Sequence, residues 1–263
     1  MDPRTARLPG VLPADPHDWL RVDDAFAAQM AERDRLVAEV PHLVHTVLPT
    51  GRVAAAELYT MVLDVLARTP GYRVDVASVL RPDGVVVALD AAAPLLTLGR
   101  LIQEDLCILQ AARPGAAGAP PAGHTMTAAI LCFPSGWTLA QKIGQPLIRI
   151  HQPVPPYSED IARRVQRLFD AIRPGQILWR ANAHSHADAT LFQPRVEADD
   201  RPRSPDGPYL RSERQCFVRL PKTQAVVFSI HTYVVRRTAL SAAEQAGLAT
   251  YLAQRGLSHQ PES

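Results

Sequence analysis

The sequence predicts an α+β domain in which helices near both ends of the chain flank a mainly antiparallel sheet. Apolar residues recur at helical spacing in segments 23–40 and 50–68, which predicts two amphipathic helices. The later segments 176–181, 215–220 and 225–235 have the composition of strands. The turn 221–224 joins the last two as an antiparallel hairpin, so helices precede a sheet built from neighbouring strands.

The composition is that of a globular protein. The chain has 263 residues, 47% of them hydrophobic, which is enough to bury a substantial core. The net charge of +2 gives no electrostatic footprint for nucleic acid or an anionic membrane. Cys107, Cys132 and Cys216 form no CxxC pair, so we predict reduced, buried thiols. With no apolar signal region and no long apolar run, we expect a cytoplasmic protein without nucleic-acid or membrane partners.

Turn and cap signals place the remaining elements of the first half. Thr50 is a candidate N-cap, and 69–71 ends the helix that follows it. Segment 82–88 predicts a turn and a short strand. Segment 111–123, rich in Ala, Pro and Gly, predicts an exposed loop, and 128–133 predicts a buried strand.

The second half contains two further helix signals. Ser158 is expected to cap a helix that ends at Pro174-Gly175, with a solvated face of arginines opposite its apolar face. Those arginines are Arg163, Arg164 and Arg167. The polar stretch 194–208 predicts a long surface loop that could cover a site. Ser241 begins a capping-box pattern, and the final helix is expected to end at Gly256.

The segment 142–155 is the first candidate for chemistry, since the generic catalytic motifs are absent. Its apolar part predicts a short strand that delivers His151 to a proline-rich turn. Imidazole is a good ligand for iron, and the prolines restrict the backbone that carries it. The alternative is a buried histidine that only makes hydrogen bonds.

A second candidate cluster lies at 179–186. Arg180 and Asn182 are two residues apart on a predicted strand, so they project from one face and could bind a carboxylate. His184 and His186 have the same spacing. Two such histidines can ligate a metal from a strand, and the alternative is an exposed loop without a ligand.

Further charged residues precede two apolar runs. Glu213 and Gln215 are expected on one face of a strand and Arg214 on the other, either as ion pairs that hold the sheet together or as part of a site. The run 103–105 predicts either a helix start with acidic residues or a carboxylate that holds an alkylammonium group.

Several runs, taken in chain order, closely resemble the haem-dependent oxidative N-demethylase α-subunit-like family. These runs are 98–99 with 103–106, 131–137, 142–144, 150–155, 180–182, 213–215, 219–222 and 227–233. The resemblance covers about residues 19–237. It implies a PAS-like sheet, and with it we expect an N-terminal extension 1–18, a single domain 19–257 and a tail 258–263.

The resemblance also implies an activity. Members oxidise an N-methyl carbon of a small amine to formaldehyde, using haem b, molecular oxygen and electrons from NADPH through a separate flavin and iron–sulfur reductase. His151 matches the segment expected to supply the axial ligand, with His184 and His186 as alternatives. The residues implied for catalysis are Arg180, Asn182, Glu213 and Arg214, and those implied for cofactor contacts are Arg180, Arg214 and Gln215.

The chain departs from the family pattern at Ala183, where a tryptophan is expected, and at His231, where an arginine is expected. The first change is expected to enlarge the pocket and the second to remove a permanent cation. We therefore expect a larger amine or a specialised metabolite as the substrate, in place of dimethylamine. The alternatives are a haem-binding sensor or carrier without turnover, and a structural member that binds no haem.

Overall fold

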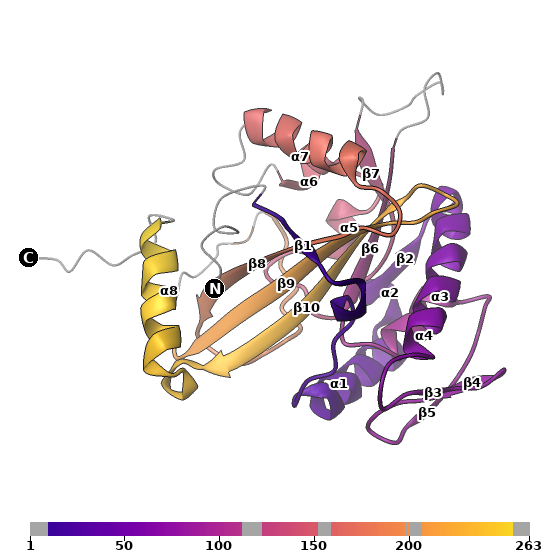
Figure 1. Cartoon of the computed structure of the whole chain (residues 1–263), viewed down its shortest axis with the longest axis horizontal. Coiled ribbons are helices and arrows are strands. Elements are labelled where there is room, and N and C mark those ends of the chain that lie inside the picture. Colours follow the sequence, from indigo (N-terminus) through magenta and orange to yellow (C-terminus); the bar gives the residue numbers. More distant parts are fainter. Residues whose placement is uncertain (1–9, 112–122, 152–158, 198, 200–206, 255–263) are drawn as a thin grey trace, which may run out of the picture.

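A large antiparallel sheet organises the chain in a computed structural model, which describes residues 10–111, 123–151, 159–197, 199 and 207–254 (Figure 1). Its seven strands have the order β1-β8-β9-β10-β6-β7-β2. In that order they are β1 (Leu12–Ala14), β8 (Ile177–His186), β9 (Tyr209–Arg219), β10 (Val226–Arg236), β6 (Asp105–Ala111), β7 (His124–Ile130) and β2 (His45–Val47). The predicted α+β class is confirmed. Since β1 pairs with β8, the sheet begins within the predicted extension 1–18.

A second, three-stranded sheet and eight helices complete the described fold. The small sheet contains β3 (Arg73–Val74), β4 (Ser78–Leu80) and β5 (Val86–Ala88). The helices are α1 (Phe26–Glu39), α2 (Pro41–Val44), α3 (Arg52–Leu66), α4 (Pro94–Gly99), α5 (Leu139–Lys142), α6 (Leu147–His151), α7 (Glu159–Ala171) and α8 (Ala242–Gln254). Short 3-10 turns lie at η2 (Pro16–Asp18), η3 (Pro49–Gly51) and η4 (Arg237–Ala239).

The two faces of the large sheet belong to two hydrophobic clusters. Cys216 packs in the cluster that contains the buried residues of α3 and α4. Its neighbour Phe217 packs in the cluster that contains Phe169 of α7. Successive strand residues point to opposite faces, so α3 and α4 cover one face and α7 covers the other. Figure 1 shows these helix groups on separate sides of the strands.

The predicted hairpin 221–224 is confirmed, and its strands are long. β9 and β10 have 11 residues each and pair from Val226↔Arg219 to Arg236↔Tyr209. The Glu57 carboxylate of α3 accepts hydrogen bonds from the backbone N–H groups of Lys222 (2.6 Å) and Thr223 (2.7 Å). This helix therefore fixes the turn that sets the register of the hairpin.

Most helix predictions are confirmed, with one corrected cap. The helices α1, α3, α7 and α8 lie where the periodicity predicts them. The capping box is present, since the Ser241 N–H donates to Glu244 Oε2 (2.8 Å) and the Glu244 N–H donates to Ser241 Oγ (3.3 Å). Thr50 is not an N-cap, because it lies inside a 3-10 turn and Gly51 precedes α3. The predicted cap Ser158 and the predicted helix end at Gly256 lie outside the described residues.

One predicted element is wrong, one of the two interpretations of 103–105 is excluded, and one predicted strand is shifted. The run before His151 is not a strand: it forms α6, in which the N–H groups of Arg149 (2.9 Å) and Ile150 (3.0 Å) donate to the Pro146 carbonyl. A proline before the first turn favours this helical start. Residues 103–105 do not start a helix, because Asp105 begins β6 and its carboxylate accepts N–H bonds from Cys132 (2.7 Å) and Phe133 (2.9 Å). The predicted strand 128–133 is shifted, since β7 ends at Ile130.

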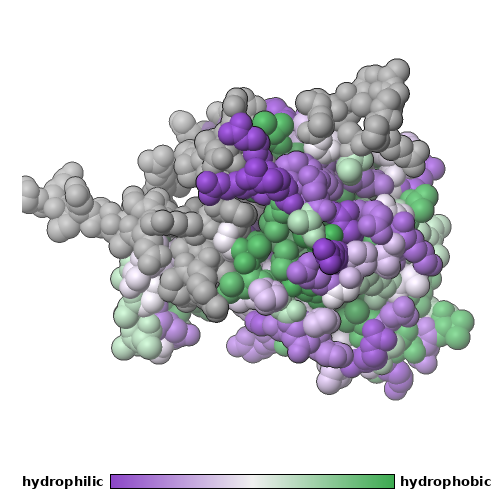
Figure 2. Space-filling model, turned by 45° about the horizontal axis from the view of Figure 1, so that its top comes forward, coloured by the Kyte–Doolittle hydropathy of each residue, from purple (hydrophilic) through white to green (hydrophobic). Residues whose placement is uncertain are grey.

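The surface is mixed in character. Arg163, Arg164 and Arg167 are exposed on α7, as predicted. Figure 2 shows hydrophilic side chains over much of one face, with hydrophobic surface gathered near its centre. Within the described ranges, every helix is too short or too polar to cross a membrane. The predicted loops 111–123 and 194–208 fall largely outside those ranges.

A Gly51→Ala variant is expected to lower the free energy of unfolding by roughly 1–3 kcal/mol, because a side chain has no room there. An added Cβ would lie 2.5 Å from the Thr127 carbonyl oxygen, which belongs to β7 and cannot rotate away. Urea unfolding monitored by circular dichroism measures the loss. Val53→Ala, at an exposed neighbouring position, is the control. Equal stability of Gly51→Ala and wild type would contradict this close approach.

Candidate functional site

Residues predicted for the site from two separate segments meet on one face of the large sheet. In the register of β8 and β9, Arg180 is opposite Gln215 and Asn182 is opposite Glu213. Paired residues in antiparallel strands share a face, as do residues two apart along one strand. Arg180, Asn182, Glu213 and Gln215, the polar network, therefore project together.

Hydrogen bonds connect the members of the polar network. Arg180 Nη1 donates to Gln215 Oε1 (3.0 Å), and Gln215 Nε2 donates to Glu213 Oε2 (3.1 Å). Asn182 Nδ2 donates to the same Glu213 oxygen (3.1 Å), and the Glu213 N–H donates to Asn182 Oδ1 (3.2 Å). These bonds fix the orientation of both amides, which in turn hold the carboxylate in one position.

Along β9, an arginine lies at one end of the polar network and aromatic side chains lie at the other. Arg211 Nε is 3.6 Å from Glu213 Oε1, and its Nη atoms donate to the carbonyls of Leu191 (2.9 Å) and Phe133 (2.5 Å). At the other end, the ring centroids of Phe217 and Phe228 are 5.1 Å apart in a stacked arrangement. At one end the polar network thus adjoins Arg211, which holds two chain segments in place. At the other end it adjoins the aromatic cluster under α7.

The two candidate histidines of β8 lie on the same face as the polar network. In the register of β8, His184 is opposite Arg211 and His186 is opposite Tyr209, so both belong to a strand and not to a loop, and His184 is exposed. Burial and the nearby Arg211 lower the pKa of His186, which favours the neutral imidazole that binds metals. No group of three or more metal-binding side chains occurs in the described residues. A haem iron, however, needs only one or two protein ligands.

His151 is the last residue of α6, and its side chain lies outside the described structure. Residues 152–155, the proline-rich remainder of its motif, are also outside it. The axial-ligand assignment therefore stays a prediction.

Arg214 is separated from the polar network by strand alternation. It lies on the opposite face of β9, where its guanidinium donates to the backbone carbonyls of Asp18 (2.5 Å) and Trp19 (3.1 Å). The same group lies 5.7 Å from the centre of the Trp179 ring. Arg214 thus holds the segment before α1 against the sheet.

The two departures from the family pattern also lie on this opposite face. Ala183 is fully buried against Leu248 and Tyr251, which are both residues of α8. The expected enlargement of a pocket at Ala183 is therefore wrong for the polar network, because the side chain points away from it. His231 lies between two carboxylates, with Nδ1 at 2.9 Å from Glu104 Oε1 and Nε2 at 3.1 Å from Asp23 Oδ2.

The charge of His231 depends on the two carboxylates beside it. Burial opposes the charged imidazolium, but the Glu104 and Asp23 carboxylates outweigh it and raise the pKa of His231 to about 9. The histidine is therefore a cation at neutral pH, but unlike the expected arginine it loses its charge as the pH rises through 9. The interpretation of run 103–105 as a carboxylate that holds an alkylammonium group did not foresee this pair, because the partner of Glu104 is a histidine of the same chain.

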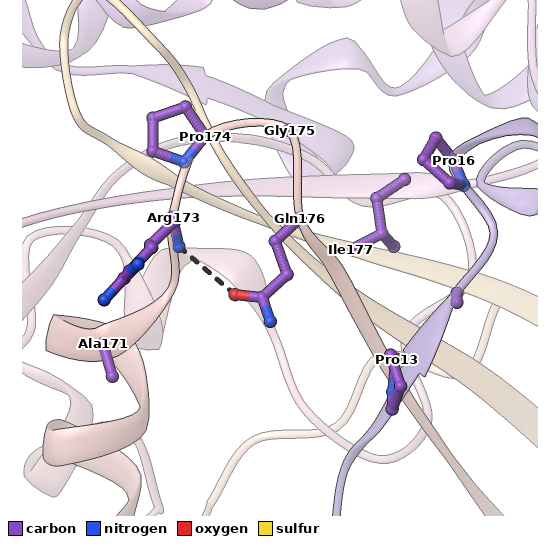
Figure 3. A pocket seen from close by; sticks show the side chains of 9 residues that line it. Pro13, Pro16, Ala171, Arg173, Pro174, Gly175, Gln176 and Ile177 are labelled. Carbon is purple, nitrogen blue, oxygen red and sulfur yellow. Dashed lines mark hydrogen bonds between the residues drawn. The ribbon is translucent and has the colours of Figure 1, made fainter.

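One surface depression contains none of the residues of the polar network. It has a volume of about 620 Å³ and is lined by Pro13, Pro16 and the turn 173–176. Figure 3 shows this turn, in which the Arg173 N–H lies 3.5 Å from Gln176 Oε1. It includes no predicted site residue, so the polar network is the better candidate for chemistry.

The donor set around the polar network fits a haem group. Arg180 is a cation suited to a propionate carboxylate, and the lowered pKa of His186 favours a neutral imidazole on the same face, whereas Arg211 is buried and already binds two backbone carbonyls. Phe217 and Phe228 supply apolar surface next to these polar groups. Arg180 can therefore orient the anionic edge of a cofactor, and the two phenylalanines can contact its apolar ring.

One known family matches most of the chain. The family described as "Haem-dependent oxidative N-demethylase, alpha subunit-like" matches residues 10–260 of the chain. No curated protein matches it. The family match spans both long strands of the polar network and the segments that cover them. The chain belongs to the haem-dependent oxidative N-demethylase, alpha subunit-like family.

Proposed function

We propose that the chain is a haem-dependent oxidase that removes an N-methyl group from a small amine or specialised metabolite. The observation that supports this most directly is the polar network, in which site residues from two segments meet on one sheet face. Haem b would supply the oxidation of the N-methyl carbon by molecular oxygen. One oxygen atom enters formaldehyde and the other enters water, with two electrons from NADPH through a separate flavin and iron–sulfur reductase.

Glu213 is the residue that we assign to the amine. Its carboxylate is held by Asn182 and Gln215, and it can accept a hydrogen bond from the N–H of an alkylammonium group. Such a contact fixes the nitrogen and thereby the direction of its methyl group. The adjoining aromatic side chains exclude water from the methyl group.

Arg180 and His151 are the residues that we assign to the cofactor. Gln215 orients the Arg180 guanidinium, which would bind a haem propionate from the edge of the polar network. His151 would supply the axial imidazole, with His184 and His186 as alternatives on the sheet itself. Because Ala183 and His231 face away from the polar network, neither change bears on the size of the amine that fits beside Glu213.

A Glu213→Gln variant is expected to lower kcat/KM for the amine roughly 10- to 100-fold, because the charge-assisted contact to the ammonium is lost. The measurement is formaldehyde release and NADPH consumption by haemin-loaded protein with a compatible reductase, over a panel of methylated amines that includes dimethylamine. Glu39→Gln, an exposed ion-paired carboxylate on α1, is the control. Unchanged kcat/KM in Glu213→Gln would remove Glu213 from the site.

The same preparations test the cofactor assignment. Visible spectra of haemin-loaded wild type, His151→Ala and His184→Ala, in oxidised, reduced and CO-bound forms, identify the ligand. A changed spectrum only in His151→Ala supports that assignment. Failure of the wild type to bind haemin would contradict the oxidase proposal. Haem binding without turnover of any amine would support the sensor or carrier alternative.

A further inference from the structure

One buried histidine fastens the second half of α7 to the large sheet. His124, the first residue of β7, has a side chain that is 1% exposed, and its ring lies edge-on to Phe169 of α7 with the ring centroids 5.2 Å apart. Gln166 of α7 binds His124 twice. The backbone N–H of His124 donates to Gln166 Oε1 (3.2 Å), and Gln166 Nε2 donates to His124 Nδ1 (2.9 Å).

These hydrogen bonds require a neutral imidazole. Gln166 Nε2 also donates to Asp170 Oδ1 (2.8 Å), and because an ionised carboxylate only accepts hydrogen bonds, this contact fixes which end of the amide is the nitrogen. His124 Nδ1 is therefore an acceptor without a hydrogen, and the ring carries its single hydrogen on Nε2. Nε2 is buried and has no hydrogen-bond partner within the described ranges.

The surroundings of His124 oppose a second proton on the ring. Burial lowers the pKa of His124, and Arg219 of β9 acts in the same direction. Asp170 and Gln166 act against them, but the Asp170 carboxylate is 3.9 Å from Nδ1 and its side chain is 60% exposed, so water screens its attraction. A proton on Nδ1 would also face the amide hydrogens of Gln166 and abolish that hydrogen bond.

A second contact holds the end of α7 without any dependence on pH in this range. Arg219 Nε donates to the carbonyl of Ile172 (2.5 Å), and its Nη2 donates to the carbonyl of Phe169. A guanidinium stays charged at every pH at which the protein is folded. Phe169 also packs on Phe217, with ring centroids 5.6 Å apart, in the aromatic cluster that adjoins the polar network. Of the two contacts, only the one at His124 can respond to acid.

We propose that α7 is a pH-sensitive cover, and that protonation of His124 releases residues 165–171 of this helix from the large sheet. The seated helix requires a neutral ring, whereas the released helix leaves a hydrated imidazole that takes up a proton at its ordinary pKa. Acid therefore favours release, and the aromatic side chains beside the polar network lose their cover. Release requires no haem, so this device is separate from the proposed oxidase activity.

Hydrogen exchange of the haem-free chain at pH 7.5 and pH 5.5, corrected for the intrinsic pH dependence of amide exchange, measures the release. The amides of Leu168 and Phe169 are expected to exchange faster at pH 5.5, by up to about tenfold. This limit is set by an imidazole with the ordinary pKa of about 6.5 in the released state. Amides of β10 are expected to keep their rate. An unchanged corrected rate in α7 at pH 5.5 would overturn the pH-sensitive cover.

Two variants assign the response to one histidine. His124→Gln carries an amide that is neutral at every pH, so its corrected exchange rates in α7 are expected to be equal at the two pH values. His42→Gln, at an exposed position on α2, is the control and is expected to respond as the wild type does. An acid response that persists in His124→Gln comes from another group and overturns the proposal.

A measurement on the wild type covers the case in which His124→Gln does not fold. The imidazole signal of His124, followed by NMR across the same pH range, is expected to titrate below the ordinary pKa of about 6.5. Titration at or above that value would show that the ring accepts a proton while α7 remains seated, and would overturn the pH-sensitive cover.

Discussion

Replacing Arg33 with methionine is expected to lower the free energy of unfolding by about 3–5 kcal/mol. Arg33 of α1 is fully buried, and its Nη1 lies 2.7 Å from Asp105 Oδ1. It also donates to the backbone carbonyls of Gly99 (2.8 Å), Gln103 (3.2 Å) and Glu104 (3.0 Å). Methionine fills similar space, but it leaves the Asp105 charge and these carbonyls buried without the cation. Urea unfolding monitored by tryptophan fluorescence measures the loss.

Arg35 provides a matched control on the same helix. It is an exposed arginine that pairs with Glu32 (2.7 Å) and Glu39 (2.6 Å). Exposed ion pairs contribute little to stability, so Arg35→Met is expected to be close to wild type. Similar losses in the two variants would show that burial does not decide the contribution of these arginines.

The second large effect is a loss of stability with rising pH that depends on His231. Its pKa is about 9 in the folded protein and near 6.5 in the unfolded chain, a difference that corresponds to roughly 3 kcal/mol. Because the folded pKa is the higher one, this contribution is complete below about pH 6.5 and is lost as the pH rises through 9. Urea unfolding at a series of pH values from 6 to 9.5 measures it.

Comparison with His231→Gln isolates this contribution. The variant leaves Glu104 and Asp23 without a cation, so it is expected to be less stable than wild type at pH 6 and to approach it by pH 9.5. His42→Gln, at an exposed position on α2, is the control and is expected to follow the wild-type curve. A stability difference that stays constant across this pH range would show that His231 is not the group that titrates.

Local patterns in the sequence predicted much of the sheet and the polar network. Strand alternation was enough to separate Glu213 and Gln215 from Arg214, because a side-chain period of two holds wherever a strand is regular. The turn 221–224 and the Ser241 capping box were also local signals. Pairing between β8 and β9 then brought together residues that each pattern had identified separately.

The errors arose where distant residues decide the structure. Asp105 looked like part of a helix start, but its carboxylate binds the backbone at Cys132 and Phe133, which no local pattern contains. Arg33 has the spacing of a polar helix residue, and only its long-range contacts show that it is buried. The run before His151 was short and apolar, a pattern compatible with either strand or helix. The helix forms because Pro146 begins its first turn and the Lys142 ammonium binds the Ile150 carbonyl near its end.

Because side chains alternate along β9, residues of the polar network can change without altering the packing on the other face of the strand. Side chains of the polar network can be exchanged for others while Arg214 and Cys216, which point to the other face, keep their packing. A directed-evolution library confined to Arg180, Asn182, Glu213 and Gln215 would therefore sample new ligand preferences on a constant scaffold. A library of the same size at consecutive positions would spend half of its changes on the scaffold itself.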